Sequence, residues 1–212
     1  MDERLKKQLA FALEIDKAKN IFRQTHLSGN GRNENDAEHS WHMAIMAYLL
    51  KEYANETIDI ARVMLLCLIH DIVEIDAGDT YAYDADGLKT QKQREDKAKE
   101  RIFSELKGIL VGDGMADLLR PHLPAEQKAE LIALFDEFEA AETAEAKFAH
   151  AMDNLQPLLL NHSNHGGDWK EHNVTAAQVY QRQSGTKPGS EKLFAVADGI
   201  IQEHIKAGNL KA

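Results

Sequence analysis

Apolar residues recur along most of this chain at the three- and four-residue spacing of a helix, and they rarely alternate with polar residues as in a strand. Polar stretches rich in Gly, Asn and Asp separate the helical patterns and indicate loops at 25–35, 76–84 and 161–168. Asp36, which follows the first of these loops, is the expected N-cap of the next helix. The pattern predicts helices over residues 3–23, 36–54, 89–110, 114–120, 125–139, 142–160, 174–183 and 190–207, and through a further segment that ends at 74.

That further segment carries a histidine, an aspartate and a glutamate within an apolar run. Its apolar residues surround the helix on nearly every side, which predicts that the helix is buried. On one helix, Glu74 would share a side with His70 and Asp71, because it follows them by four and three residues. A buried aspartate is costly unless its charge is compensated. We predict a metal ion as that compensation.

The chain has 212 residues, of which 43% are hydrophobic and 28% charged, a balance typical of a globular domain with or without an extension. Its net charge of −10 argues against a broad basic surface for long nucleic acids. Cys67 is the only cysteine in the sequence, so an intrachain disulfide is excluded. The sequence shows neither an apolar run long enough to span a membrane nor the apolar run of a signal peptide, which predicts a cytoplasmic protein.

Four residues are candidate metal ligands: His39, His70, Asp71 and Asp153. Each falls in or at the end of a predicted helix, and helical folds assemble metal sites from side chains on facing helices. Two imidazoles and two carboxylates form a mixed nitrogen and oxygen set, which suits one divalent Mn, Co, Fe, Ni, Zn or Mg ion. On a six-coordinate ion this set would leave two positions open, for water and for a substrate oxygen.

Four short motifs carry a family resemblance: Arg-Asn-Glu-Asn-Asp-Ala-Glu-His-Ser at 32–40, His-Asp-Ile-Val-Glu at 70–74, Gly-Asp-Thr at 78–80, and the stretch 146–153 that ends at Asp153. In this combination the chain resembles the HD-domain metal-dependent phosphohydrolases, and within them the 5′-deoxynucleotidase branch of the YfbR-like and HD-domain-containing-protein-2 type. The resemblance covers roughly residues 10–160. It implies an all-α fold, with an HD-domain helical bundle over 1–165 and a C-terminal helical extension over 166–212 packed on the same domain.

The resemblance also implies a function, the hydrolysis of the phosphate monoester of a (deoxy)nucleoside 5′-monophosphate by a metal-activated water. It makes the four candidate residues the metal ligands. It makes Glu74 the acidic residue beside the reaction centre, and it places Asp79 and Thr80 in the loop that contacts substrate. Arg23 and Arg32 are the expected phosphate-binding residues. Homodimers occur among such proteins, and we expect the apolar residues Phe135 and Phe138 to be exposed and to form the contact.

The resemblance departs at Gln24, where the nucleotidase branch carries a Trp after the arginine, so the choice between ribose and deoxyribose stays open. Glu74 has two possible roles, as a proton-transfer residue or as a partner that orients a ligand histidine. An oxygenase with two irons is an alternative function, but only His122 and His150 lie between the His-Asp pair and the last Asp. A non-catalytic metal- or nucleotide-binding module is another alternative. The absence of a Gly-Tyr-Pro triplet argues against a cyclic-dinucleotide phosphodiesterase.

Overall fold

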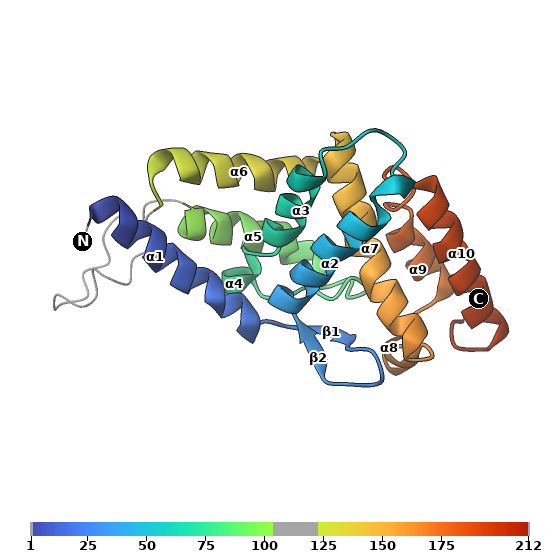
Figure 1. The fold of residues 1–212 in the computed structure, drawn as a ribbon. Helices are drawn as coiled ribbons and strands as arrows, with labels where there is room; N and C mark the ends of the chain where they lie inside the picture. Colours follow the sequence, from blue (N-terminus) through green and yellow to red (C-terminus); the bar gives the residue numbers. More distant parts are fainter. Residues whose placement is uncertain (1, 104–122, 212) are drawn as a thin grey trace.

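The structure is a computed structural model that describes residues 2–103 and 123–211. Within these residues it is helical apart from one small two-stranded sheet, so the predicted all-α bundle is confirmed (Figure 1). The elements in chain order are α1 (Glu3–Ile15), a 3₁₀ helix (Asp16–Asn20), β1 (Phe22–His26), β2 (Asn33–Asn35), α2 (Asp36–Leu50), a 3₁₀ helix (Lys51–Tyr53), α3 (Ile60–Ile69), α4 (Glu74–Ala77), α5 (Leu88–Phe103), α6 (Ala125–Ala140), α7 (Ala144–Ser163), α8 (Gly167–Glu171), α9 (Ala176–Gln183) and α10 (Glu191–Lys206).

Helices α2, α3 and α7 pack against one another and form the centre of the bundle. Helix α7 has 20 residues, most of which are buried, and Thr143 begins it by accepting a hydrogen bond from the Ala146 amide. Helix α6 packs on α3 and α7, whereas α9 and α10 lie along the other side of α7 (Figure 1). The C-terminal residues therefore cover the same core helix as the rest of the chain does.

Helix α2 begins with a capping box at Asn35, so the prediction of Asp36 as N-cap is wrong by one residue. The Asn35 side chain accepts a hydrogen bond from the Glu38 amide at 3.0 Å, and the Asn35 amide donates to the Glu38 carboxylate at 3.2 Å. Because Asn35 does the capping, the Asp36 carboxylate is free to point inward, and Asp36 is 1% exposed.

A β-hairpin replaces the end of the predicted helix over 3–23 and most of the predicted loop over 25–35. Strand β1 pairs with β2 in antiparallel fashion, and Gly29 and Asn30 turn the chain between them with φ of 76° and 56°. The strands are short and mostly polar, so they give no alternating apolar signal. The hairpin is held by its pairing and by the turn, and it positions Arg23 on β1.

Helix α3 ends at Ile69, so the predicted continuous helix through Glu74 is wrong. His70 is the C-cap, and the backbone then makes tighter turns in which the Ile72 amide bonds to Ile69 O and the Glu74 amide to Asp71 O. Helix α4 starts at Glu74. The prediction that this helix is buried holds for only part of its surface, because Leu65 and Leu68 on α3 are 43% and 44% exposed.

Other predictions also differ from the structure. Helix α7 continues to Ser163, and α8 occupies part of the stretch predicted as a loop at 161–168. Phe135 and Phe138 are 5% and 3% exposed, so they belong to the core and cannot form the predicted dimer contact. The predicted helix over 114–120, and the end of the one over 89–110, lie outside the described residues.

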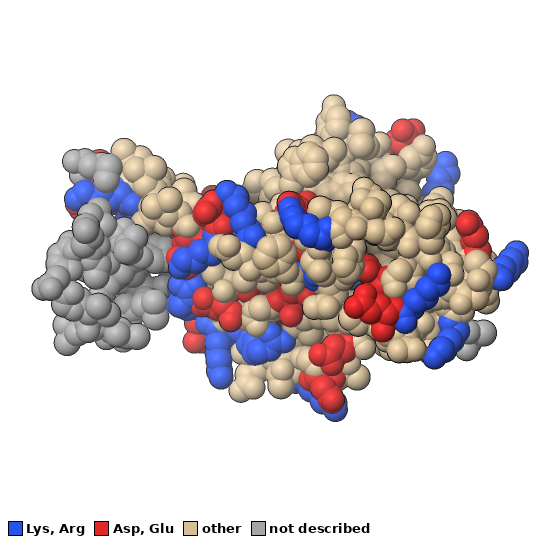
Figure 2. All heavy atoms as spheres, turned by 90° about the horizontal axis from the view of Figure 1, so that it is seen from below, with Lys and Arg blue, Asp and Glu red and all other residues tan. Residues whose placement is uncertain are grey.

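Exposed apolar side chains gather instead on α2 and α3, at Trp41, Ile45, Tyr48, Leu49, Leu65 and Leu68. Among the described helices, none combines the length and the apolar character that crossing a membrane requires. On the face drawn in Figure 2, acidic and basic side chains are interspersed rather than gathered by sign.

Candidate metal centre

His39, His70 and Asp153 come together from three helices at the centre of the bundle. His39 lies in the first turns of α2, His70 ends α3, and Asp153 lies in the middle of α7. Their ligating atoms lie within 4.8 Å of one another, and all three residues are buried. His39 Nε2 is 3.2 Å from Asp153 Oδ1, and His70 Nε2 is 4.0 Å from the same oxygen. Donors bound about 2.1 Å from one ion are themselves about 3–4 Å apart, so this spacing fits a shared ion.

Asp71 adds a fourth donor from the turn that follows α3. Its Oδ1 lies 3.0 Å from His70 Nε2, and its Oδ2 lies 3.9 Å from His39 Nε2. Burial raises the pKa of Asp71, but the charges of His70 and Arg23 outweigh burial and lower it below its usual range. The four predicted ligands therefore meet in one place, and Asp71 is held ionised there.

Both histidines are oriented so that Nε2 faces the other ligands. His39 Nδ1 lies 3.0 Å from Gln156 Oε1, and His70 Nδ1 lies 2.9 Å from Cys67 O. Because each of these oxygens accepts a hydrogen bond from Nδ1, Nε2 is the ring nitrogen that would bind a cation. His70 Nε2 is buried without a hydrogen-bond partner in the described part of the chain. A buried, unpaired ring nitrogen beside two carboxylates fits a metal ligand.

A second acidic group, Asp36, Asp71 and Glu74, adjoins these ligands within the same 4.8 Å spacing. Both carboxylate oxygens of Asp36, and Oε2 of Glu74, are buried with no hydrogen-bond partner among the described residues. Burial and the charge of Asp71 raise the pKa of Asp36 to about 7, and the same causes raise the pKa of Glu74. Three carboxylates this close together repel one another unless a cation lies beside them, so the site fits a metal ion.

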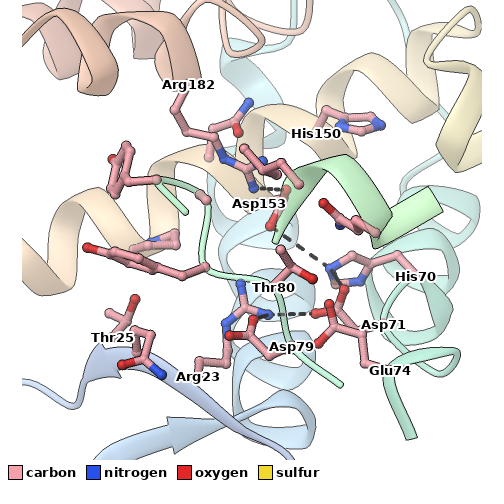
Figure 3. Close-up of a pocket in the computed structure, with 18 of the residues that line it drawn as sticks. Arg23, Thr25, His70, Asp71, Glu74, Asp79, Thr80, His150, Asp153 and Arg182 are labelled. Carbon is pink, nitrogen blue, oxygen red and sulfur yellow. Dashed lines mark hydrogen bonds and ion pairs between the residues drawn. The ribbon is translucent and has the colours of Figure 1, made fainter. Parts of the chain in front are cut away.

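Two arginines reach the centre from different parts of the chain (Figure 3). Arg23 Nη1 donates to Asp71 Oδ2 at 2.8 Å and also lies 3.7 Å from Asp36 and 3.8 Å from Asp79. Arg182, from α9, donates to Asp153 Oδ2 at 2.5 Å. Arg23 is almost buried, whereas about a third of the Arg182 side chain is exposed. The centre thus has two guanidinium groups beside its carboxylates.

The structure does not bring Arg32 to this centre, although the sequence suggested it for substrate binding. The Arg32 side chain is 54% exposed and pairs with Glu38, the residue that completes the α2 capping box. Sequence reasoning missed Arg182 and Asp36. Arg182 lies outside the motif region, and Asp36 was taken for a helix cap.

Asp79 and Thr80 form a loop beside the centre, as predicted from the Gly-Asp-Thr motif. Gly78 ends α4 with a φ of 73°, a conformation that favours glycine and turns the chain sharply towards Asp79. Arg94 of α5 donates to the carbonyl oxygens of Ala77 and Gly78 and to the Thr80 hydroxyl. Arg94 therefore fixes both the backbone at the start of this loop and the Thr80 side chain.

The centre opens into a pocket lined by residues from β1, the loop after α4, α7 and α9. Its lining includes Arg23, Asp71, Glu74, Asp79 and Asp153, together with aromatic residues. His150 also lines the pocket, but its Nε2 lies 2.7 Å from Phe138 O and its ring stacks on that phenyl group. Its Nε2 therefore carries the proton, and His150 belongs to neither group of possible metal-ligating residues found in the described part of the chain.

Comparison with known proteins gives three consistent similarities. A family model described as HD domain matches residues 15–194. Relatives named 5′-deoxynucleotidase HDDC2 are 28% identical over 128 residues in Homo sapiens and 29% identical over 140 residues in Xenopus laevis. These matches cover 60% and 66% of this chain, and 53% and 57% of the relatives. The chain thus spans little more than half the length of the curated relatives it matches.

A solved structure matches nearly the whole chain. It is the crystal structure of a predicted metal-dependent phosphohydrolase from Magnetospirillum magnetotacticum MS-1. The two are 47% identical with a TM-score of 0.86, and the match covers 99% of this chain and 96% of the other. The similarity therefore includes the C-terminal helices that carry Arg182.

Proposed function

Since this chain belongs to the HD domain family, as its motifs predicted, we propose that it is a metal-dependent phosphohydrolase that removes phosphate from a nucleoside 5′-monophosphate. The convergence of His39, His70, Asp71 and Asp153 on one small volume carries the proposal. Similarity to the bacterial crystal structure supports the metal-dependent hydrolysis, and similarity to the 5′-deoxynucleotidases supports the nucleotide substrate.

These four residues would hold one divalent ion. Such an ion, when bound, lowers the pKa of a water ligand and so supplies a hydroxide nucleophile at neutral pH. The mixed nitrogen and oxygen donors suit Mn, Co, Fe, Ni, Zn or Mg. Gln156 and the Cys67 carbonyl would keep the two imidazole rings in the orientation that binding needs.

Arg23 and Arg182 would bind the phosphate. A guanidinium group presents a planar fork of donors that matches two phosphate oxygens. Arg23 approaches from the hairpin and Arg182 from α9, and both line the pocket. The two guanidinium groups would bind a phosphate dianion between them and offset the repulsion from the surrounding carboxylates.

Glu74 and Asp79 would serve the leaving group. Glu74 is buried beside Asp71 and lines the pocket, where its carboxyl group would donate a proton to the departing alkoxide oxygen. Asp79 lies 3.8 Å from Arg23 and also lines the pocket, where it would accept a hydrogen bond from a sugar hydroxyl. The neighbouring Thr80 hydroxyl is tied to Arg94, so its part in binding would be to hold the loop.

The experiment that tests this proposal is a metal-supplemented phosphatase assay. Purified protein is analysed for bound metals and then given ribo- and deoxyribonucleoside 5′-monophosphates, sugar phosphates and small phosphate esters. We expect phosphate release from nucleotides that depends on an added divalent ion. No release from any ester, combined with metal-dependent O₂ consumption, would instead support the oxygenase, and metal or nucleotide binding with no turnover would support a binding module.

The matched variants are Asp71→Ala and Asp86→Ala. Asp71→Ala removes a proposed ligand and should abolish both turnover and metal retention, while circular dichroism reports an intact fold. Asp86 is exposed and its side chain is 90% accessible, so Asp86→Ala should behave as wild type. An Asp71→Ala protein that keeps the wild-type rate and metal content would rule out the proposed site.

A further inference from the structure

A second set of unpaired polar atoms lies in the pocket outside the metal-ligand set. Asn161 Oδ1 and the Tyr81 hydroxyl are both buried and have no hydrogen-bond partner in residues 2–103 or 123–211. Both residues line the same pocket as Asp153, and Asn161 is 5% exposed. Buried polar groups in folded proteins are normally paired, so two unpaired groups on residues that line one pocket point to a ligand.

The chemistry that Asn161 offers is defined by its other hydrogen bond. Its Nδ2 donates to the Pro157 carbonyl at 3.1 Å, and only the nitrogen end of an amide can make that bond. The oxygen end is therefore the one left unpaired, and it is an acceptor. The Tyr81 hydroxyl can donate as well as accept. A group bound here must supply at least one N–H or O–H donor to Asn161.

Helix α7 sets the distance from this acceptor to the proposed metal ligands. Asp153, Pro157 and Asn161 follow one another at four-residue intervals along α7, and all three line the pocket. Eight residues at a rise of 1.5 Å per residue correspond to about 12 Å along the helix. A ligand that reaches both ends is thus longer than a phosphate group with a small alcohol, and has about the length of a mononucleotide.

Aromatic side chains line this end of the pocket. Trp169 and Tyr83 contribute to the lining, and the rings of Tyr81 and Tyr83 meet edge to face with centroids 5.2 Å apart. Trp169 is 1% exposed, so its position is fixed by the core. Rigid aromatic walls favour a flat ring, which can lie against them in offset or edge-on contact.

We propose that Asn161 and Tyr81 form a recognition subsite for the hydrogen-bonding edge of a planar heterocycle carried by the leaving group, in the chemical class of a nucleobase. This inference rests on the proposed phosphohydrolase function and specifies its substrate. A phosphate ester without such a ring leaves both buried groups unpaired, and sites built to bond a substrate N–H or O–H discriminate strongly against analogues that lack it.

The kinetic test compares two substrates, a nucleoside 5′-monophosphate and ribose 5-phosphate. Asn161→Leu and Tyr81→Phe should each lower the ratio of kcat/KM for the nucleotide to that for ribose 5-phosphate by about three- to tenfold, the effect of one lost hydrogen bond. The matched controls are Asn20→Leu and Tyr48→Phe, since Asn20 and Tyr48 are exposed and lie outside the pocket. These controls should keep the wild-type ratio. Unchanged ratios in both pocket variants would overturn the inference.

A binding test keeps the inference separate from the proposed function. The sequence has two tryptophans, Trp41 and Trp169, so a Trp41→Phe protein reports on the pocket through Trp169 fluorescence alone. Titration of this metal-free protein with the nucleotide should change the emission, and ribose 5-phosphate should change it far less. Adding Tyr81→Phe should weaken nucleotide binding about three- to tenfold without a large change in fold.

The outcomes can be told apart. If wild-type protein hydrolyses neither ester but binds the nucleotide through Asn161 and Tyr81, the proposed function fails and the subsite stands. If both esters are hydrolysed with equal efficiency and both produce the same fluorescence response, the function stands and the subsite fails. A nucleotide analogue with its ring N–H groups methylated should lose the affinity that Asn161→Leu loses, because the acceptor then has no donor to pair with.

Discussion

Arg182 Nη2 lies 2.5 Å from Asp153 Oδ2, so a residue of α9 is hydrogen-bonded to a proposed metal ligand on α7. Burial raises the pKa of Asp153, but Arg182 and the hydrogen bond from His39 outweigh burial and lower it below the usual range. The C-terminal helices thus contribute a charge to the centre as well as covering it. This contact also orients the guanidinium group, which would otherwise sample many rotamers.

Replacing Arg182 should weaken phosphate binding more than it weakens the fold. Arg182→Met keeps much of the side-chain volume and removes the charge, so we expect kcat/KM for a nucleotide to fall about 10- to 100-fold, the range for a charge-assisted hydrogen bond. Arg182→Lys should recover only part of the loss, because an ammonium group lacks the planar fork. Arg32→Met is the control, since Arg32 is exposed and pairs with Glu38. Equal losses in Arg182→Met and Arg32→Met would contradict the assignment.

Gln156 should matter for metal affinity although it is not a proposed ligand. Its Oε1 accepts from His39 Nδ1 at 3.0 Å, and its Nε2 donates to Glu34 Oε1 at 2.6 Å, with all three residues buried. Gln156→Leu removes the acceptor that holds His39 in its tautomer. We expect the dissociation constant for the divalent ion to rise about 10- to 100-fold, measured by competition with a chelating dye. Gln93→Leu, at an exposed position on α5, should leave it unchanged.

Stability should depend on pH through Glu14, which is not part of the metal centre. Burial raises the pKa of Glu14, but Lys17 and Arg101 outweigh burial and lower it. A lowered pKa in the folded protein means that the ionised carboxylate adds stability above the ordinary pKa, and this stability is lost as the pH falls. We expect Glu14→Gln to reduce the free energy of unfolding by about 1–2 kcal/mol at pH 7.

As the pH falls below the ordinary pKa of the carboxyl and through its lowered folded pKa, the wild-type carboxyl becomes protonated, so the difference between Glu14→Gln and wild type should shrink. Denaturant titrations at pH 7 and at a series of acidic pH values measure this difference. A difference that keeps the same size along the series would show that Glu14 acts through packing and that its charge is not the cause.

The apolar face of α2 and α3 is where we expect the predicted homodimer to form. Trp41, Tyr48 and Leu49 on α2 are 61%, 53% and 65% exposed, and the adjoining α3 exposes Leu65 and Leu68. Exposed apolar side chains on two neighbouring helices favour an interaction surface. Trp41→Ser should shift the mass measured by light scattering from dimer to monomer at micromolar concentration. A wild-type protein that is monomeric at that concentration would contradict the dimer itself.

Much of the centre follows from sequence because its ligands lie on strongly patterned helices. His39 lies in α2, His70 caps α3 and Asp153 lies in α7. All three residues are buried in the core that these helices form. Asp71 was placed correctly beside His70 even though the helix through Glu74 was wrong. The tight turns after Ile69 keep Asp71 and Glu74 close together, so the error in secondary structure did not separate them.

The parts that sequence did not reveal depend on contacts between distant residues. The hairpin is polar and its strands are short, so its pairing leaves no periodic signal. Arg182 has no motif around it and becomes part of the site only because α9 packs on α7. Gln156 resembles any helical glutamine until the fold brings it within 3.0 Å of His39.

The end of α3 at Ile69 has an electrostatic consequence for the ion. The last carbonyl groups of a helix have no partners within the helix itself, and the aligned peptide dipoles give that end a partial negative charge of about half an electron. Because His70 caps α3, this negative end lies beside the donor atoms and attracts a cation through the main chain itself. Side-chain substitutions cannot remove that attraction. A protein stripped of one carboxylate ligand, such as Asp71→Ala, should therefore lose the ion during purification but keep a weak, salt-sensitive attraction for divalent ions in solution.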